Sequence, residues 1–325
     1  MKILSQLLIT AASVAALTAV AHAADPVSDG PLIVDARMRA WIGTVDYVWQ
    51  HDASGLNPSF GNPTSVLDWQ NIPFLGPELD LDVYSVETGL FARGRVGLSM
   101  EMGKSRFDDW DYLADGTAFS YTQSRARLDN GFHGIFDIGT EIPGAVTDRY
   151  RLNAFAGYFG GSYQLEANGL DCLISLDAGG ANQCAGGVSV LPDTVKAIGH
   201  DLTINALRLG LSGHADVTDR FTLSFDGAYL PWLSFRTEDK HYLRTDLGPL
   251  PNIVSDASGH AFQVQAGASY RVGAATSLNL DLRYWHFDVD GDVVFAPGTA
   301  APSPALPQSS KLGVMAVGFG LSHKF

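Results

Sequence analysis

The stretch SLNLDLRY, residues 277–284, alternates without a break between apolar and polar side chains. In an extended chain successive side chains point to opposite faces, so this alternation predicts a β-strand with one apolar and one polar face. The polar face carries the charges of Asp281 and Arg283, and the apolar face carries Leu278, Leu280, Leu282 and Tyr284. One such strand does not yet say which of its two faces looks inward.

The same alternation recurs along the chain, and its length decides between two kinds of β protein. A soluble sandwich also alternates, but its apolar face is the inner one and its strands are usually short. Here many strands are about ten residues or longer and their polar faces are charged, as in a membrane barrel with an apolar outside and a polar lumen. Further examples are LFARGRVGLSME (90–101), FTLSFDGAY (221–229), AFQVQAGASYRV (261–272) and KLGVMAVGFGLSHKF (311–325). We therefore predict an all-β fold, a transmembrane antiparallel up-and-down β-barrel.

The connections between the predicted strands alternate in length. They are long after odd-numbered strands and short after even-numbered ones, as in PGAVTD (143–148) and ADVTD (215–219). Because short turns face the periplasm and long loops face outward, the ends of the third and seventh strands should meet at the extracellular rim. The aromatic Phe325 at the end of the last strand resembles the C-terminal assembly signal of outer-membrane barrels. About ten strands are expected, near 34–50, 64–82, 90–103, 132–142, 149–167, 199–214, 220–238, 259–272, 276–290 and 311–325.

The first residues predict export. Lys2 is followed by the apolar run ILSQLLITAASVAALTAV and then by the small residues Ala21 and Ala23. This pattern is typical of a secretory signal peptide over residues 1–23, which leaves 24–325 as the barrel domain. A transmembrane anchor is the alternative reading of the same run.

Charge and cysteine content limit the partners. The chain has 35 Asp and Glu against 21 Lys and Arg, a net charge of −14, which argues against a nucleic-acid partner because no basic patch is present to neutralise phosphates. The two cysteines, Cys172 and Cys184, share the loop-like stretch DCLISLDAGGANQCAGG. In an oxidising compartment they are expected to form a disulfide, and no metal site is expected from them.

Two short stretches carry candidate catalytic groups. Asp239 and His241 lie two residues apart in SFRTEDKHYLR (234–244), and Asp109 and Asp111 lie two residues apart in GKSRFDDWDYLADG (103–116). Side chains at i and i+2 of a strand share a face, so each stretch presents a pair. The third and seventh strands lie nearly opposite each other in a ring of about ten. The two pairs should therefore face each other across a groove that opens outward.

These four residue types can activate water. An imidazole can deprotonate a water molecule while a neighbouring carboxylate fixes its tautomer. Two adjacent carboxylates raise the pKa of one of them, so that Asp109 or Asp111 could carry the proton that a leaving amine needs. Such a site hydrolyses an amide without a nucleophilic Ser or Cys and without a metal.

The constellation resembles the omptin family of outer-membrane aspartate/histidine proteases over most of the mature chain. EDKHY (238–242) is similar to the family's Asp-x-His-Tyr motif, and DWDY (109–112) to its Asp-x-Asp-Trp, with Tyr112 in place of Trp. Further similar segments are GTVDYVW (43–49), SVLDW (65–69), SYTQSR (120–125), RLNAFAGYFGGSYQLEANG (151–169) and AIGH (197–200).

The resemblance implies an outer-membrane endopeptidase whose catalytic residues are Asp109, Asp111, Asp239 and His241. Its site would face the extracellular side and its substrates would be polypeptides. The resemblance also suggests that lipopolysaccharide is needed for activity, with no other cofactor, and the barrel is expected to be a monomer.

Departures from the family pattern put the substrate preference in doubt. Omptins have an acidic residue two positions before the catalytic Asp, where this chain has Thr237; Glu238 and Asp46 are candidates to substitute for it. Ala126 stands where the family has a His. A second register of FDDWDY would place Phe107 at the first Asp position, but the register with Asp109 and Asp111 keeps both carboxylates.

Each of these motifs also has a simpler, non-catalytic interpretation. Asp-x-His on an exposed strand is usually a solvated face, and Asp108, Asp109 and Asp111 could be an acidic loop cluster. DVDGD (288–292) starts like a calcium loop but lacks the closing Glu. Arg93, Arg95 and Arg283 are expected to be lumen charges neutralised by facing carboxylates. The alternative functions are a catalytically weakened barrel that serves as an adhesin or structural protein, and a passive channel, which a charged lumen disfavours.

Overall fold

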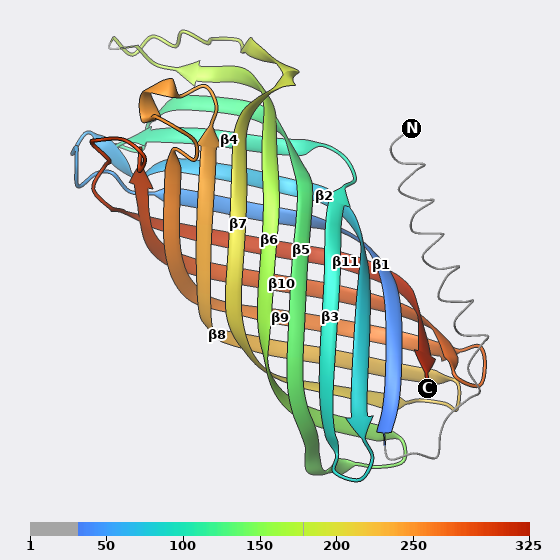
Figure 1. Ribbon diagram of the computed structural model, residues 1–325. Coiled ribbons are helices and arrows are strands. Elements are labelled where there is room, and N and C mark those ends of the chain that lie inside the picture. Colours follow the sequence, from blue (N-terminus) through green and yellow to red (C-terminus); the bar gives the residue numbers. More distant parts are fainter. Residues whose placement is uncertain (1–31, 178) are drawn as a thin grey trace.

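A single antiparallel sheet closes on itself in the computed structural model, which describes residues 32–177 and 179–325 (Figure 1). The ring closes because β1 pairs with β2 on one side and with β11 on the other. The predicted signal peptide lies outside the described residues. The strands are β1 (Leu32–His51), β2 (Phe60–Ser85), β3 (Leu90–Glu101), β4 (Ser105–Leu113), β5 (Ala118–Val146), β6 (Tyr150–Ser175), β7 (Val188–Asp216), β8 (Phe221–His241), β9 (Ile253–Arg271), β10 (Thr276–Phe295) and β11 (Leu306–Lys324).

Strands β3 and β4 share one position in the ring. Both pair with β2 on one side and with β5 on the other, and residues 102–104 interrupt the strand between them. The barrel therefore has ten positions, which confirms the predicted all-β barrel of about ten strands. The third position continues beyond the predicted end at residue 103, and its second segment carries one of the candidate pairs.

The two ends of the barrel differ as predicted. Turns 86–89, 147–149, 217–220 and 272–275 connect strands at one end, and the connections at the other end include 176–187, 242–252 and 296–305. A 3₁₀-helix, Thr245–Leu247, lies in one of these loops, and no helix in the described part of the chain is long and apolar enough to cross a membrane. Cys172 and Cys184 form the predicted disulfide.

The connection after the third position is shorter than expected. Only residues 114–117 separate β4 from β5, because the chain assigned to a loop continues as strand on both sides of the turn. The predicted strand 132–142 is likewise part of a much longer one, since β5 and β7 have 29 residues each. A tilted strand crosses a membrane with about 9–11 residues, so more than half of each long strand projects beyond it.

The alternation of apolar and polar residues reverses along the barrel, as β7 illustrates. In its second half Leu207 and Leu209 are exposed on the outer surface while Arg208 is buried in the lumen. In its first half Leu202 is buried inside and Thr203 is exposed outside. The expected polar lumen is thus correct only for the half with the apolar belt. The projecting half has water outside, so it holds an apolar core.

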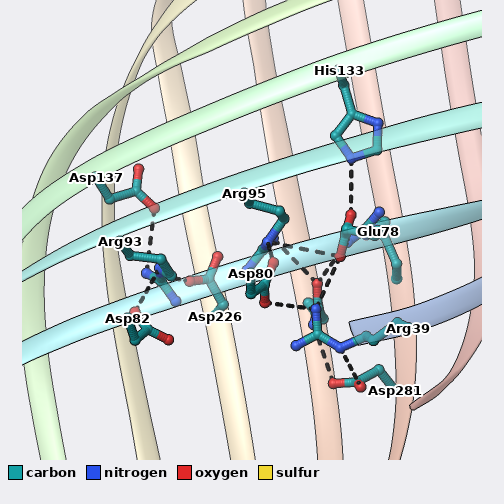
Figure 2. Close-up of polar contacts among 12 residues, drawn as sticks. Arg39, Glu78, Asp80, Asp82, Arg93, Arg95, His133, Asp137, Asp226 and Asp281 are labelled. Atoms are coloured by element: carbon teal, nitrogen blue, oxygen red, sulfur yellow. Dashed lines mark hydrogen bonds and ion pairs between the residues drawn. The ribbon is translucent and has the colours of Figure 1, made fainter. Parts of the chain in front are cut away.

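Charged side chains fill the lumen within the belt (Figure 2). Arg39 lies within 2.7–2.9 Å of three carboxylates, on Glu78, Asp80 and Asp281. A second cluster joins Arg93 and Arg208 to Asp137 and Asp226.

The lumen arginines are neutralised as the sequence predicted. Arg95 lies 2.9 Å from Asp80, Arg283 lies 2.7 Å from Glu78, and Arg93 lies 2.8 Å from Asp226. A lumen cross-linked in this way leaves little room for a passive channel.

An aromatic layer lies above the ion pairs and fills the projecting half. Its members are fully buried. The rings of Trp69 and Phe107, on neighbouring strands, are 4.3 Å apart, and those of Phe159 and Phe287, on strands far apart in the ring, are 5.7 Å apart. The layer consists of Tyr47, Trp69, Phe107, Phe159, Phe235 and Phe287. It forms an apolar floor beneath the rim where the loops meet.

Candidate active site

A β-bulge in β8 aims one candidate pair into the barrel. Below it, Leu223 and Phe225 are exposed on the outer surface, whereas beyond it Phe235 is buried inside. The pairing with β9 shifts between Leu230 and Leu233, and one extra residue reverses which side chains point inward. Asp239 and His241 consequently point into the barrel at its loop end.

The second pair comes from β4, which follows Phe107 into the aromatic layer. Since Phe107 packs inside the barrel, the alternating residues Asp109 and Asp111 also face inward. Asp108 faces the other way, and its carboxylate accepts hydrogen bonds from Gln70, Arg106, Tyr121 and Gln123. The alternative register would place the core residue Phe107 at a carboxylate position.

Asp239 and His241 are joined directly. His241 Nε2 lies 3.1 Å from Asp239 Oδ2. Asn252, which is fully buried, holds the His241 backbone: its Oδ1 accepts a hydrogen bond from the His241 N–H at 2.9 Å, and its Nδ2 donates to the His241 carbonyl at 3.1 Å. The imidazole therefore has little freedom to leave its carboxylate.

Burial above the apolar floor raises the pKa of Asp109 to about 7, and the neighbouring charge of Asp111 adds to this effect. The positive charges of His241 and Arg244 act in the opposite direction. The pKa of Asp111 is also raised by burial, but hydrogen bonds from Ser65 and Ser120 oppose the shift. Asp109 is thus the carboxyl group that can hold a proton near neutral pH.

In the other pair, Asp239 and His241, the pKa shifts favour the charged forms. Burial alone would raise the pKa of Asp239, but the charge of His241, the hydrogen bond with His241 and the 3.6 Å contact with His200 bring it well below its ordinary value. For His241, burial lowers the pKa, yet the facing charges of Asp239 and Asp109 leave it raised overall. Asp239 is therefore ionised, and the two pairs lie close enough that each shifts the pKa of the other.

The remaining sequence candidates are divided between the two faces. Thr237 is buried and points inward with Asp239. Glu238 points outward, where it pairs with Arg236. Asp46 is exposed on the outer face of β1, and its Oδ1 accepts a hydrogen bond from the Asn71 N–H at 2.7 Å. The structure does not bring Asp46 and Glu238 into the groove.

Asp46 supports a second β-bulge. Asn71 has a left-handed backbone (φ 48°) at the point where the pairing of β1 with β2 shifts. By holding the Asn71 N–H, Asp46 stabilises the extra residue that turns Leu67 and Trp69 inward. Its role in the structure is to shape the wall of the site.

Three residues near the site were not singled out by the sequence. Asn252 lies in the loop after β8, and no local pattern marks it. His200 was noted only as part of AIGH, and Arg244 only as the end of a quoted stretch. Among the described residues, no group of three or more His, Cys, Asp or Glu side chains could hold a metal ion.

Comparisons with known proteins agree with this architecture. The family model described as the Omptin family matches residues 57–293. The crystal structure of the outer-membrane protease OmpT from Escherichia coli superposes with a TM-score of 0.70 at 16% identity, covering 93% of this chain and 99% of that one.

Other solved barrels match less well. The outer-membrane protein OprG from Pseudomonas aeruginosa has a TM-score of 0.32 at 9% identity, covering 90% of this chain and 95% of its own. The translocator domain of autotransporter NalP from Neisseria meningitidis has a TM-score of 0.36 at 10% identity, covering 100% and 98%. No curated protein sequence matched the chain.

Proposed function

This chain belongs to the omptin family, and on that premise we propose that it is an outer-membrane endopeptidase that hydrolyses peptide bonds with an activated water. The observation that carries the proposal is that two unlike pairs at the loop end of the barrel lie close enough to shift the pKa of each other. Asp239 with His241 supplies an oriented base, and Asp109 with Asp111 supplies a carboxyl group that can hold a proton near pH 7.

The proposed reaction begins at the imidazole. Because His241 Nε2 bonds to ionised Asp239, its proton is held there and the lone pair lies on Nδ1. Nδ1 accepts a proton from the water as the water oxygen attacks the carbonyl carbon. Asp109 then donates its proton to the leaving nitrogen while the C–N bond breaks. Asp111, to which Ser65 and Ser120 donate hydrogen bonds, orients the water.

Peptide cleavage by the purified barrel tests the proposal. The protein is reconstituted in lipid with and without lipopolysaccharide and incubated with a fluorogenic peptide library. We expect cleavage that serine- and cysteine-directed covalent inhibitors and chelators leave unchanged, since the proposed nucleophile is water. Absence of cleavage under both conditions would instead favour a barrel with a binding or structural role.

The proposal requires the loop end of the barrel to face outward. Epitope tags inserted in the loops at Gly179 or Gly248 should be recognised by antibody on intact cells, whereas tags in the turns at Thr147 or Thr218 should not. Gly179, Thr147 and Thr218 are exposed and Gly248 is partly exposed, so a tag at any of these sites should leave the fold intact. The reverse labelling pattern would place the groove in the periplasm and contradict the proposed location.

We expect no strong preference for basic residues at the cleavage position. Of the three sequence candidates for a basic subsite only Thr237 points inward, and it is uncharged. Peptides with Arg and with a neutral residue at this position should therefore have kcat/KM values within a few-fold of each other. Thr237→Asp should raise the ratio in favour of Arg by about tenfold or more, because a close charge pair contributes at least ~1.5 kcal/mol. A strong preference for Arg in the unmodified protein would contradict this assignment.

A further inference from the structure

A second histidine lies behind the candidate dyad. His200, on β7, is paired across the sheet with Asp239 on β8 and is completely buried. Its Nδ1 lies 3.6 Å from Asp239 Oδ2, the same oxygen that His241 Nε2 contacts at 3.1 Å. Asp239 thus lies between two imidazoles that come from neighbouring strands.

Tyr47 is the hydrogen-bond partner of His200 on the side away from Asp239. The Tyr47 hydroxyl lies 3.1 Å from His200 Nε2 and 3.3 Å from Ser310 Oγ. Burial raises the pKa of Tyr47, so it remains a neutral phenol that can donate. When Tyr47 donates to Nε2, the proton of a neutral His200 is on Nδ1 and points toward Asp239.

The rest of the Asp239 carboxylate has no other anchor. Its Oδ1 is buried, and in the described part of the chain it has no hydrogen-bond partner. A carboxylate held only by His241 can rotate and lose its alignment. The other ionisable groups around the dyad are Asp109 and Asp111 from β4, Arg244 from the loop after β8 and Tyr47 from β1.

We propose that His200 is a positioning residue for the peptidase reaction: as the neutral Nδ1–H tautomer set by Tyr47, it holds Asp239 in place against His241. The expected effect on kcat rests on the proposed function. The expected effect on the position of Asp239 does not. His200 acts through Asp239 and does not reach the substrate, because it is completely buried.

The test compares His200→Leu with His200→Asn. Leu removes the donor, whereas the Asn side-chain amide can place an N–H near the position of Nδ1. His200→Leu is expected to lower kcat a few-fold to about tenfold with a smaller change in KM, because the 3.6 Å contact from Nδ1 to Asp239 is longer than a full hydrogen bond. His200→Asn should recover most of this loss. Tyr47→Phe, which removes the tautomer-setting donor, should give a smaller decrease.

The second measurement is independent of catalysis. NMR of ¹³C-labelled histidine in the micelle-bound protein follows the titration of His241, identified by its absence in His241→Gln. Since Asp239 raises the pKa of His241, releasing Asp239 should shift the titration to lower pH in His200→Leu and not in His200→Asn.

The outcomes separate the two proposals. An unshifted His241 titration in His200→Leu would overturn the positioning role, as would equal losses of kcat in the Leu and Asn variants. A shifted titration in a barrel that cleaves no peptide would support the positioning of Asp239 and overturn the proposed function.

Discussion

Replacement of His241 by Ala should lower kcat by roughly three to six orders of magnitude and change KM far less, as expected when a catalytic base acts chiefly in the transition state. The imidazole is the group that faces both the ionised Asp239 and the protonatable Asp109. Without it, no base remains beside the proposed water position. The measurement is steady-state kinetics on a peptide identified from the library.

Lys240→Ala is the matched control. Lys240 is adjacent in the same strand, but it points outward and pairs with Asp201. Its removal should leave kcat within a few-fold of the parent value. Full activity in His241→Ala, or an equal loss in Lys240→Ala, would contradict the assignment of the base.

The acidic limb of the pH profile should also belong to His241. The reaction requires neutral His241, so kcat/KM falls as the pH drops through its pKa. Because the ionised Asp239 raises that pKa, the fall should begin above the ordinary histidine value of about 6.5. From the sequence alone, without the burial and charges of the site, only the ordinary histidine pKa could be expected for His241.

The sequence predicted best the half of the barrel that contacts lipid. There the outside must be apolar and the lumen can be charged, so alternation in a segment such as 277–284 identifies both strand and face. In the projecting half the same strands have a dry inside and a wet outside. Their alternation is reversed, so β4 and the first part of β5 were read as loop.

The face on which Asp239 and His241 lie could not be obtained from alternation. Counting by twos from Leu223 and Phe225, which face outward, places Asp239 and His241 on the same outer face. The bulge between Leu230 and Leu233 reverses the count, and the one local signal for it is Pro231, because a proline inside a strand favours a bulge. The spacing correctly predicted that the two side chains share a face; only the strand pairing shows which face.

Two further residues near the site, His200 and Asn252, were missed in the sequence because they reach it only through long-range contacts. His200 reaches Asp239 only because β7 and β8 are in register at that point. Asn252 is eleven residues beyond His241 and returns to it through the loop. Such partners are determined by the closed sheet and not by any local spacing.

The two carboxyl groups on β4 should not be interchangeable. Both are partly buried and raised in pKa, but only Asp111 has hydroxyl donors, Ser65 and Ser120, that favour its ionised form. Asp109 lacks this opposing effect, and its pKa reaches about 7. The asymmetry assigns the transferable proton to Asp109 and the orienting charge to Asp111.

Asp109→Asn should therefore lower kcat by about 10²- to 10⁴-fold, the range for loss of a general acid. In the parent protein activity should fall as the pH rises above about 7, because Asp109 then loses the proton it donates. That basic limb should be absent in Asp109→Asn and retained, at a lower rate, in Asp111→Asn.

Asp108→Asn is the matched control and should lower activity little, because Asp108 faces outward. The combined loss in kcat of Asp109→Asn with His241→Ala should be much smaller than the product of the two single losses, because base and acid serve one reaction and removing either group already disables it. A basic limb that vanished in Asp111→Asn and persisted in Asp109→Asn would exchange the two roles.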